Sequence, residues 1–252
     1  MIKRNELLDY INNTLQPRQI KDYCPNGLQV EGCEQVKKVI TGVTASLALI
    51  EAAIERGADT ILVHHGYFWK GEAEAIKGMK KQRLKKLLAH DINLFAYHLP
   101  LDIHPELGNN AQLAKLLGIT IERGLEVGNK TSIAMAGRLQ QPQTAEEFGA
   151  TIEAKLGRKP LVVEANKDKI ETIALCTGGG QGFIDMAADQ SFDAYLSGEA
   201  SEQTIHTSRE MNIHFFAAGH HATERYGVKA LGEHLADKFG LDVEFVDIDN
   251  PV

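Results

Sequence analysis

The chain lacks long apolar runs. None of its 252 residues lies in a stretch approaching the ~18 consecutive apolar residues that a membrane-spanning helix needs, so we expect no membrane partner. The segment 1–15 has the spaced apolar residues of an amphipathic helix and no apolar core of the secretory type. We therefore expect no signal peptide.

Cysteine is scarce as well, and basic residues are fewer than acidic ones. The three cysteines, Cys24, Cys33 and Cys176, form no Cys-x-x-Cys pair, which argues against a disulfide framework or a thiolate zinc site and suits the cytoplasm. The net charge of −7 gives no global attraction to nucleic acid. The basic stretch Lys77–Lys86 is either a solvated helix face or a rim that attracts phosphate. Nucleic-acid binding in a locally basic cavity stays open as an alternative.

The common nucleotide-binding fingerprints are also absent. Thr177-Gly-Gly-Gly-Gln181 follows a predicted strand, but it contains neither Gly-x-Gly-x-x-Gly nor Gly-Lys-Ser/Thr. Its glycines fit a plain tight turn, and they equally fit a loop whose backbone N–H groups hold an anion. Both interpretations stay open at this stage.

What the chain does contain is an alternation of strand-like and helix-like segments. Hydrophobic residues make up 43% and charged residues 24%, as in ordinary globular proteins. The predicted strands are 36–43, 60–63, 92–97, 173–176, 194–196 and 213–217, and the predicted helices between them include 47–54, 78–88, 109–117 and 182–188. This rhythm predicts an α/β fold with two similar lobes of mixed or largely parallel sheet flanked by helices.

The two halves of the sequence resemble each other. Asp59-Thr-Ile-Leu-Val aligns with Asp193-Ala-Tyr-Leu-Ser, and His98-x-x-x-Asp102 aligns with His220-x-x-x-Glu224. We interpret this as an internal duplication, with a first lobe at residues 1–125 and a second at residues 126–252. The segment Thr120–Gln143, which contains several glycines and a proline, is the predicted link between the lobes.

Imidazoles and carboxylates follow several predicted strands at their carboxyl ends, where open parallel sheets bind ligands. These residues are His64 and His65, then His98 with Asp102, then Glu199, and finally His220 and His221 with Glu224. Each group taken alone is equally explained by a satisfied polar pair or a capping pair at the surface. Because they recur at duplicated positions, they favour a common metal site.

The spacing of the later groups suits chelation. His220 and Glu224 are four residues apart in a segment expected to open a helix, so both lie on one face. His98 and Asp102 have the same spacing, although Pro100 disfavours a regular helix there. Nitrogen and carboxylate ligands without thiolates suit zinc, iron or manganese and fit calcium poorly. The number of candidate ligands exceeds the need of one ion, so we expect two divalent metal ions per chain.

The loop after the histidine pair is aromatic. Gly66-Tyr67-Phe68-Trp69-Lys70 holds the only tryptophan of the chain. These rings either pack down as a plug or form a wall on which a planar substrate stacks.

Eight segments together resemble a known family. They are Pro25–Gly32, Gly42–Ser46, His64–Gly66, His98–Asp102, Gly108–Asn110, Thr177–Gln181, Ser197–Glu199 and Gly219–Glu224. The chain is similar in them to the Nif-three-like family, whose members are often labelled GTP cyclohydrolase type-two homologues.

The resemblance implies two similar α/β lobes with a dinuclear metal site between them. It also implies a ring-shaped homohexamer, a trimer of dimers, with the sites facing an inner cavity. The metal ligands of the family fall on His64, His65, Asp102, His220 and Glu224. We assign proton transfer to His98, with His221 as the neighbouring alternative.

The leading hypothesis is therefore a metal-dependent hydrolase acting on a small nucleotide-like or anionic substrate, with activated water as the nucleophile. The glycines 178–180 and the lysines near Lys80 would receive negative charge. The alternative is a non-catalytic metal-handling protein or a ring-shaped scaffold.

Overall fold

The computed structural model describes all 252 residues, and these form two compact units. Unit 1 comprises Met1–Leu101 and Gly227–Asp249, and unit 2 comprises Asp102–Tyr226 and Asn250–Val252. These bounds differ from the predicted lobes 1–125 and 126–252. The C-terminal segment belongs with the first unit because its strand β13 (Asp242–Phe245) pairs in parallel with β4 (Lys38–Thr44).

Unit 1 contains a five-stranded sheet in the order β13-β4-β5-β6-β2. The pairs β4–β5 and β5–β6 are parallel, while β2 is antiparallel to β6. Its remaining elements are β1 (Ile2–Lys3), α1 (Arg4–Leu15), η1 (Pro17–Gln19), β2 (Gly27–Val30), β3 (Gln35–Val36), α2 (Leu47–Glu55), β5 (Thr60–His65), α3 (Gly78–Ala89) and β6 (Asn93–Ala96). The short helix α4 (Leu99–Asp102) ends this part of the chain, and α9 (His220–Phe239) enters unit 1 at Gly227.

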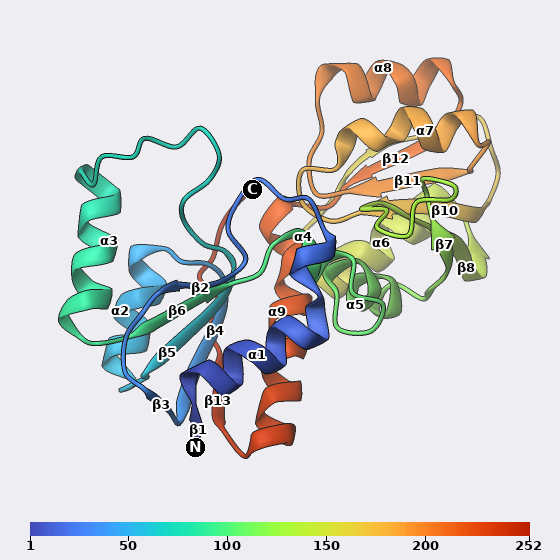
Figure 1. Cartoon of the computed structure of the whole chain (residues 1–252). Helices are drawn as coiled ribbons and strands as arrows, with labels where there is room; N and C mark the ends of the chain where they lie inside the picture. Colours follow the sequence, from blue (N-terminus) through green and yellow to red (C-terminus); the bar gives the residue numbers. More distant parts are fainter. The chain divides into compact units, whose positions relative to one another are not determined.

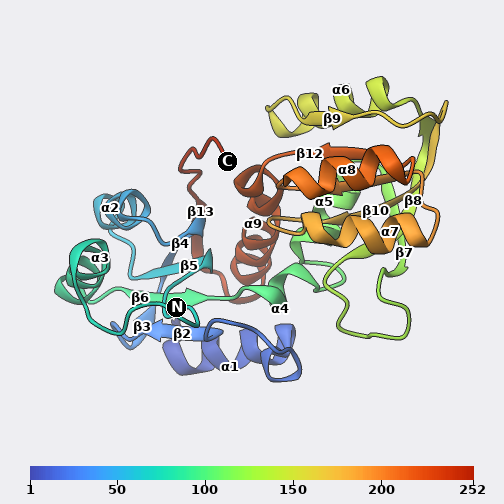
Figure 2. The same cartoon turned by 90° about the horizontal axis from the view of Figure 1, so that it is seen from above.

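Alternating side chains cover both faces of this sheet. Helices α2 and α3 lie on one side of β4, β5 and β6, and α1 lies on the other side (Figure 2). Ile61 and Val63 of β5 pack with Leu49 of α2 in the first layer. A Cβ on Gly232 of α9 would approach Thr41 of β4 to 2.7 Å, so α9 packs closely against the opposite face. Both faces are thus buried, as expected for parallel strands.

Unit 2 contains a six-stranded sheet in the order β7-β8-β10-β11-β12-β9. The strands β10, β11 and β12 are parallel, and β8 and β9 flank them in antiparallel pairing. The elements are α5 (Asn109–Leu116), β7 (Ile119–Gly124), β8 (Met135–Gln143), α6 (Ala145–Leu156), β9 (Leu161–Val163), β10 (Ile170–Cys176), η2 (Gln181–Phe183), α7 (Ile184–Asp189), β11 (Ala194–Ser197), α8 (Glu202–Glu210) and β12 (His214–Ala217).

The period of two along these strands divides the core of unit 2 into two layers. Ile173 and Leu175 pack with α5 and α6, while Ala174 and Tyr195 pack with α7 and α8. Figure 1 shows α7 and α8 on one side of β10–β12 and α5 and α6 on the other. The predicted α/β architecture is confirmed. None of the helices is both long and apolar enough to span a bilayer.

The prediction that Thr120–Gln143 is a link is wrong. Most of this segment forms β7 and β8, which pair in antiparallel register with Ile119 opposite Leu139. Gly137 allows this pairing, because a Cβ there would lie 2.2 Å from the Thr120 carbonyl oxygen. A glycine read as a flexible linker residue is therefore a site of close backbone approach.

Equivalent hydrogen bonds support the internal duplication. The Oδ2 atom of Asp59 accepts the backbone N–H groups of Lys37 and Lys38 at 2.8 and 3.0 Å. The Oδ2 atom of Asp193 accepts those of Glu171 and Thr172 at 3.1 and 2.9 Å. Asp59 in unit 1 and Asp193 in unit 2 are thus equivalent, and each fixes the start of the corresponding strand.

Candidate metal centre

Three imidazoles gather at the carboxyl ends of neighbouring strands in unit 1. His64 and His65 are the last residues of β5, and His98 follows β6 after Tyr97. The ring centroids of His64 and His65 lie 4.5 Å apart, and those of His64 and His98 lie 5.1 Å apart. One ring nitrogen from each of the three lies within 4.8 Å of the others, so the group could hold a metal ion. The two histidines of the pair lie nearer to each other than the alternation of a strand predicts.

The Nδ1 atom of each of these rings is held by an oxygen. Nδ1 of His64 donates to the Tyr97 carbonyl oxygen at 2.9 Å. Nδ1 of His65 lies 3.2 Å from the Thr44 hydroxyl, and Nδ1 of His98 lies 2.8 Å from the Asp22 carboxylate. Because a carbonyl oxygen only accepts, a neutral His64 carries its proton on Nδ1 and presents a lone pair at Nε2. This is how histidine ligands are oriented in metal sites.

Asp22 organises the surroundings of His98. Its carboxylate also accepts from the side chain of Asn26 at 2.9 Å and from the backbone N–H of Leu99 at 3.0 Å. Burial raises the pKa of Asp22, but the hydrogen bonds from His98 and Asn26 outweigh burial and lower it to about 2. The carboxylate is therefore ionised and fixes the proton of His98 on Nδ1.

In unit 2, an imidazole and two carboxylates meet at the start of α9. Nε2 of His220 lies 3.1 Å from Oε2 of Glu224 one turn along the helix, and its Nδ1 lies 2.6 Å from Oε1 of Glu199. Burial lowers the pKa of His220, but the hydrogen bonds and negative charges of Glu224 and Glu199 outweigh burial and raise it to about 9. The surroundings thus favour positive charge at this position.

Asp102 is the second buried carboxylate of unit 2, with 5% of its surface exposed. Its Oδ1 accepts from the side chain of Asn109 at 2.8 Å and from the Thr177 hydroxyl at 3.3 Å. Asn110 donates to the carbonyl oxygen of Asp102 and accepts the backbone N–H of Thr177. The start of α5 and the end of β10 therefore hold this carboxylate in place.

Gly178 lets the backbone approach both groups at the start of α9. A Cβ at this position would lie 2.0 Å from Oε1 of Glu224 and 3.2 Å from Nε2 of His220. Its φ angle of 62° also favours glycine. The next glycine is different, because a Cβ on Gly179 would meet nothing closer than 3.8 Å.

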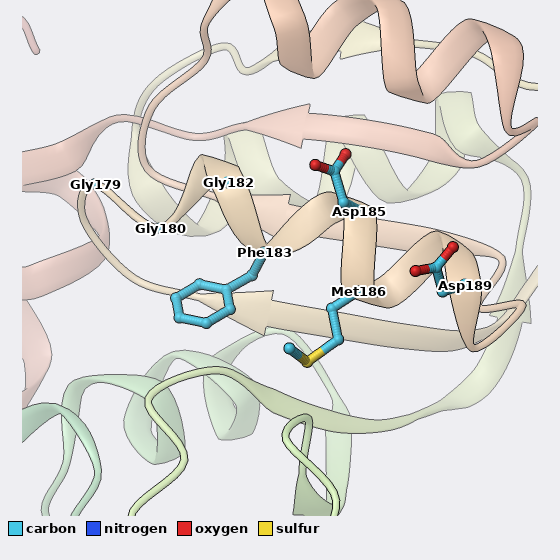
Figure 3. A pocket seen from close by; sticks show the side chains of 7 residues that line it. All are labelled: Gly179, Gly180, Gly182, Phe183, Asp185, Met186 and Asp189. Carbon is cyan, nitrogen blue, oxygen red and sulfur yellow. The ribbon is translucent and has the colours of Figure 1, made fainter.

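The surroundings of the glycine turn favour the plain tight turn over the anion loop, two interpretations that the sequence leaves open. The carboxylates of Glu224 and Glu199 flank Gly178 and Gly179. A pocket of about 580 Å³ on the other side of the turn contains Phe183, Met186 and two further carboxylates, Asp185 and Asp189 (Figure 3). The negative charge disfavours an anionic ligand here.

The basic stretch on α3 is only partly a solvated helix face, because Lys80, Arg83 and Lys86 are half-buried. Lys80 pairs with Glu72 at 3.2 Å, and Lys86 pairs with Glu51 at 3.0 Å. The guanidinium of Arg83 lies 5.8 Å from the centroid of the Tyr67 ring. The prediction that the lysines near Lys80 receive substrate charge gains no support from these contacts.

Each unit brings predicted residues together. His64, His65 and His98 lie together in unit 1. In unit 2, a carboxylate oxygen of Glu224 lies 3.1 Å from Nε2 of His220, and one lies within 4.8 Å of an oxygen of Asp102. The donors are imidazole nitrogens and carboxylate oxygens oriented by further hydrogen bonds, so they fit zinc, iron or manganese. His221 donates its backbone N–H to the Val252 carbonyl oxygen.

Sequence reasoning missed the residues that orient the ligands. Asp22 lies in a loop before β2 and follows no strand. The sequence leaves the role of Glu199 open, although its place after a strand equivalent to β5 is a usable signal. For Gly178 the sequence predicts only a turn or an anion loop, since its contacts with the start of α9 arise from tertiary structure.

Comparison with known proteins gives a consistent result. The model of the family described as Duf34/NIF3 (NGG1p interacting factor 3) matches residues 2–251. A Vibrio cholerae protein named "GTP cyclohydrolase 1 type 2 homolog" is 61% identical over 244 residues, which are 96% of this chain and 96% of that protein. The solved structure of protein ybgI, of unknown function, has a TM-score of 0.96 and 55% identity, covering 100% of each chain. The structure of TTHA1606 from Thermus thermophilus has a TM-score of 0.90 and 36% identity, again covering 100% of each chain.

Proposed function

The chain belongs to the Duf34/NIF3 family, as its sequence motifs predicted, and on this premise we propose that it is a metal-dependent hydrolase. His64, His65, Asp102, His220 and Glu224 bind two divalent ions in this proposal. The substrate is a small nucleotide-like or anionic molecule. The name "GTP cyclohydrolase 1 type 2 homolog" of the relatives supports a nucleotide as the first candidate.

The orientation of the imidazoles is the observation that carries the proposal. Each of the three histidine ligands has Nδ1 within 3.2 Å of an oxygen, from Tyr97, Thr44 or Glu199. Such anchoring at Nδ1 is what orients histidine ligands in metal sites. The two carboxylate ligands are both at least nine-tenths buried, where an ionised group needs a compensating charge.

Divalent ions held by these residues would polarise a substrate oxygen and activate water near neutral pH. His98 moves the proton, since Asp22 holds its Nδ1 and the exchange with substrate or water takes place at Nε2. Asp22 keeps the ring in one orientation throughout.

The test is turnover of a nucleotide panel, including GTP, by metal-loaded protein. We expect turnover by the wild type and none by the double variant His64→Ala, Glu224→Ala, which removes one ligand from each unit. His98→Ala should retain the metal and lose about 100-fold or more in kcat, as expected for loss of a general acid or base. Equal turnover in the wild type and the double variant would refute catalysis at these residues.

A chain that binds the ions but turns over no substrate would instead be a metal-handling protein. The two roles differ in how the ions are released. A handling protein gives its ions readily to a chelator and to an acceptor protein, whereas the proposed hydrolase retains them.

We also propose that the chain self-associates as a homohexamer, as the family resemblance implies. Apolar side chains exposed just before and at the start of α3 support an interface, since Ile76 and Met79 are 57% and 66% exposed. Light scattering should give a hexameric mass, and Ile76→Glu with Met79→Glu should lower it if these side chains lie in the interface.

A further inference from the structure

Two aromatic rings stand beside the imidazole of His98 in unit 1. The Trp69 ring meets His98 edge to face, with centroids 4.9 Å apart, and lies 5.9 Å from His65. The Tyr23 ring lies 5.3 Å from His98 and 6.4 Å from Trp69. Tyr23 is 52% exposed, so much of a large ring faces solvent next to the proposed proton carrier.

The loop that carries Trp69 is rigidly built. The side chain of Gln29 accepts the Tyr67 backbone N–H at 2.7 Å and donates to its carbonyl oxygen at 3.1 Å. Gly66 makes room for this clamp, because a Cβ there would lie 2.1 Å from Oε1 of Gln29. The Trp69 backbone N–H donates to Glu72, and its indole N–H donates to the Gly66 carbonyl oxygen.

One residue of the same loop has an unfavourable backbone conformation. Phe68 has a φ of 64°, which is unfavourable for a residue with a side chain. Tyr67 on one side of it is buried and donates its hydroxyl to the Ala45 carbonyl oxygen at 2.7 Å. Phe68 thus lies between Tyr67, which packs into the core, and Trp69, which lies beside the imidazoles of His98 and His65. The loop combines both interpretations that the sequence allowed.

We infer that Trp69 and Tyr23 form a stacking subsite for the planar heterocycle of the substrate. This inference rests on the proposed function and names the part of the substrate that the protein recognises. A ring stacked there lies next to His98, where a proton is exchanged. A cationic ligand is disfavoured, because the divalent ions of the proposed centre would make the neighbourhood positive.

The subsite recognises a ring and not a phosphate. Lys80 at the start of α3 is already occupied, since it pairs with Glu72 and lies 4.9 Å from the centroid of the Phe68 ring. Stacking tolerates different bases, because every base offers an aromatic face. The hydrogen-bonding groups of the ring are then left for the metal centre and for His98.

Because Trp69 is the only tryptophan, the tryptophan fluorescence of the chain comes from this subsite. The experiment titrates zinc-loaded full-length protein with guanosine, ribose 5-phosphate and tetramethylammonium, with correction for ligand absorption and with calorimetry in parallel. We expect saturable quenching by guanosine and none by the other two. Tyr23→Ala should weaken guanosine binding about tenfold, and Tyr23→Phe should change it less than about twofold.

Phe183→Ala is the matched control, because Phe183 is the aromatic side chain of the separate pocket in unit 2 (Figure 3). It should leave guanosine binding unchanged. The inference is overturned if ribose 5-phosphate or tetramethylammonium quenches as well as guanosine does, if Tyr23→Ala binds guanosine like the wild type, or if Phe183→Ala abolishes binding.

The zinc content of every sample is measured separately. A chain that binds none of zinc, iron and manganese refutes the proposed function, while guanosine quenching still decides the subsite. A zinc-loaded chain whose fluorescence ignores guanosine refutes the subsite and leaves the metal centre standing.

Discussion

The two units contain equivalent sets of three parallel strands, β4–β6 in unit 1 and β10–β12 in unit 2, which pair in the same register. The aspartate at the amino ends of these strands is conserved between the units, and the residues at the carboxyl ends differ. At the amino ends, Asp59 and Asp193 accept equivalent pairs of backbone N–H groups. At the carboxyl ends, Val63 of β5 is equivalent to Ser197 of β11 by strand pairing. His64 and His65 therefore correspond to Gly198 and Glu199.

The two units have kept the aspartate hydrogen bonds at the amino ends of these strands and differ in the side chains at the carboxyl ends. Unit 1 presents imidazole nitrogens, while unit 2 presents mainly carboxylate oxygens around a single imidazole. His65, a proposed chelating residue of unit 1, corresponds to Glu199 in unit 2, which lies 2.6 Å from the proposed ligand His220 and orients it. The residues that support the fold thus lie at the amino ends of these strands, and the residues of the candidate site lie at their carboxyl ends.

We expect the largest effect, a loss of metal affinity, from a substitution of Gly178, which is equivalent to Thr44 in unit 1. Gly178→Ala places a methyl group 2.0 Å from the present Oε1 of Glu224 and must displace it. We expect metal affinity to fall about 100-fold, as for loss of a ligand's support. Gly179→Ala, with no close contact, should keep wild-type affinity in the same competition titration with a chromogenic chelator.

A smaller effect is expected at Glu199, which is equivalent to His65. Glu199→Gln keeps the size of the side chain but removes the charge that orients His220. Metal affinity should fall about 10-fold to 100-fold, the usual range for such supporting groups. Glu202→Gln is the control, because the Glu202 side chain is 92% exposed on α8. Equal affinities in the two variants would mean that Glu199 has no orienting role.

The shared aspartates should affect stability and leave metal binding alone. Asp59→Asn and Asp193→Asn each weaken charge-assisted hydrogen bonds to two backbone N–H groups, so we expect each to cost about 1–3 kcal/mol in the free energy of unfolding. The loss should be larger at Asp193, which also pairs with Lys167 at 3.1 Å. Denaturant unfolding at neutral pH measures both.

The smallest effect is the pH dependence of the Asp193 contribution. Burial raises its pKa, but the hydrogen bonds from Thr172 and Lys167 outweigh burial and lower it. A lowered folded-state pKa stabilises the fold above the unfolded value near 4 and loses this contribution as the pH falls. The difference in unfolding free energy between wild type and Asp193→Asn should therefore shrink below about pH 4. A constant difference would contradict an ionised Asp193 in the fold.

Local patterns predicted the elements that carry the candidate site. The apolar runs before His64 and after Asp91 form β5 and β6, and the segment at His220 opens a helix, α9, as expected. Strand pairing makes Ala96 of β6 equivalent to Ala217 of β12. The segment from Ala217 to His220 is one residue longer than the segment from Ala96 to His98, and the sequence still matches the two histidines. That extra residue is Gly219, whose φ of 99° suits glycine.

The unpredicted features depend on contacts between segments distant in sequence. β7 and β8 look like a linker because their glycines signal flexibility, and only their pairing shows why Gly137 is needed. The contact of Asp22 with His98 joins a loop before β2 to the end of β6. Periodicity carries no information about such contacts.

The most direct test of the metal centre is the elemental content of protein purified without added metal. The account predicts about two divalent ions per chain. It also predicts their loss when His64 and His65 of unit 1 or His220 and Glu224 of unit 2 are replaced by alanine in a chain that keeps its circular dichroism spectrum. A wild-type chain without bound metal, or a variant that retains the full content, would contradict it.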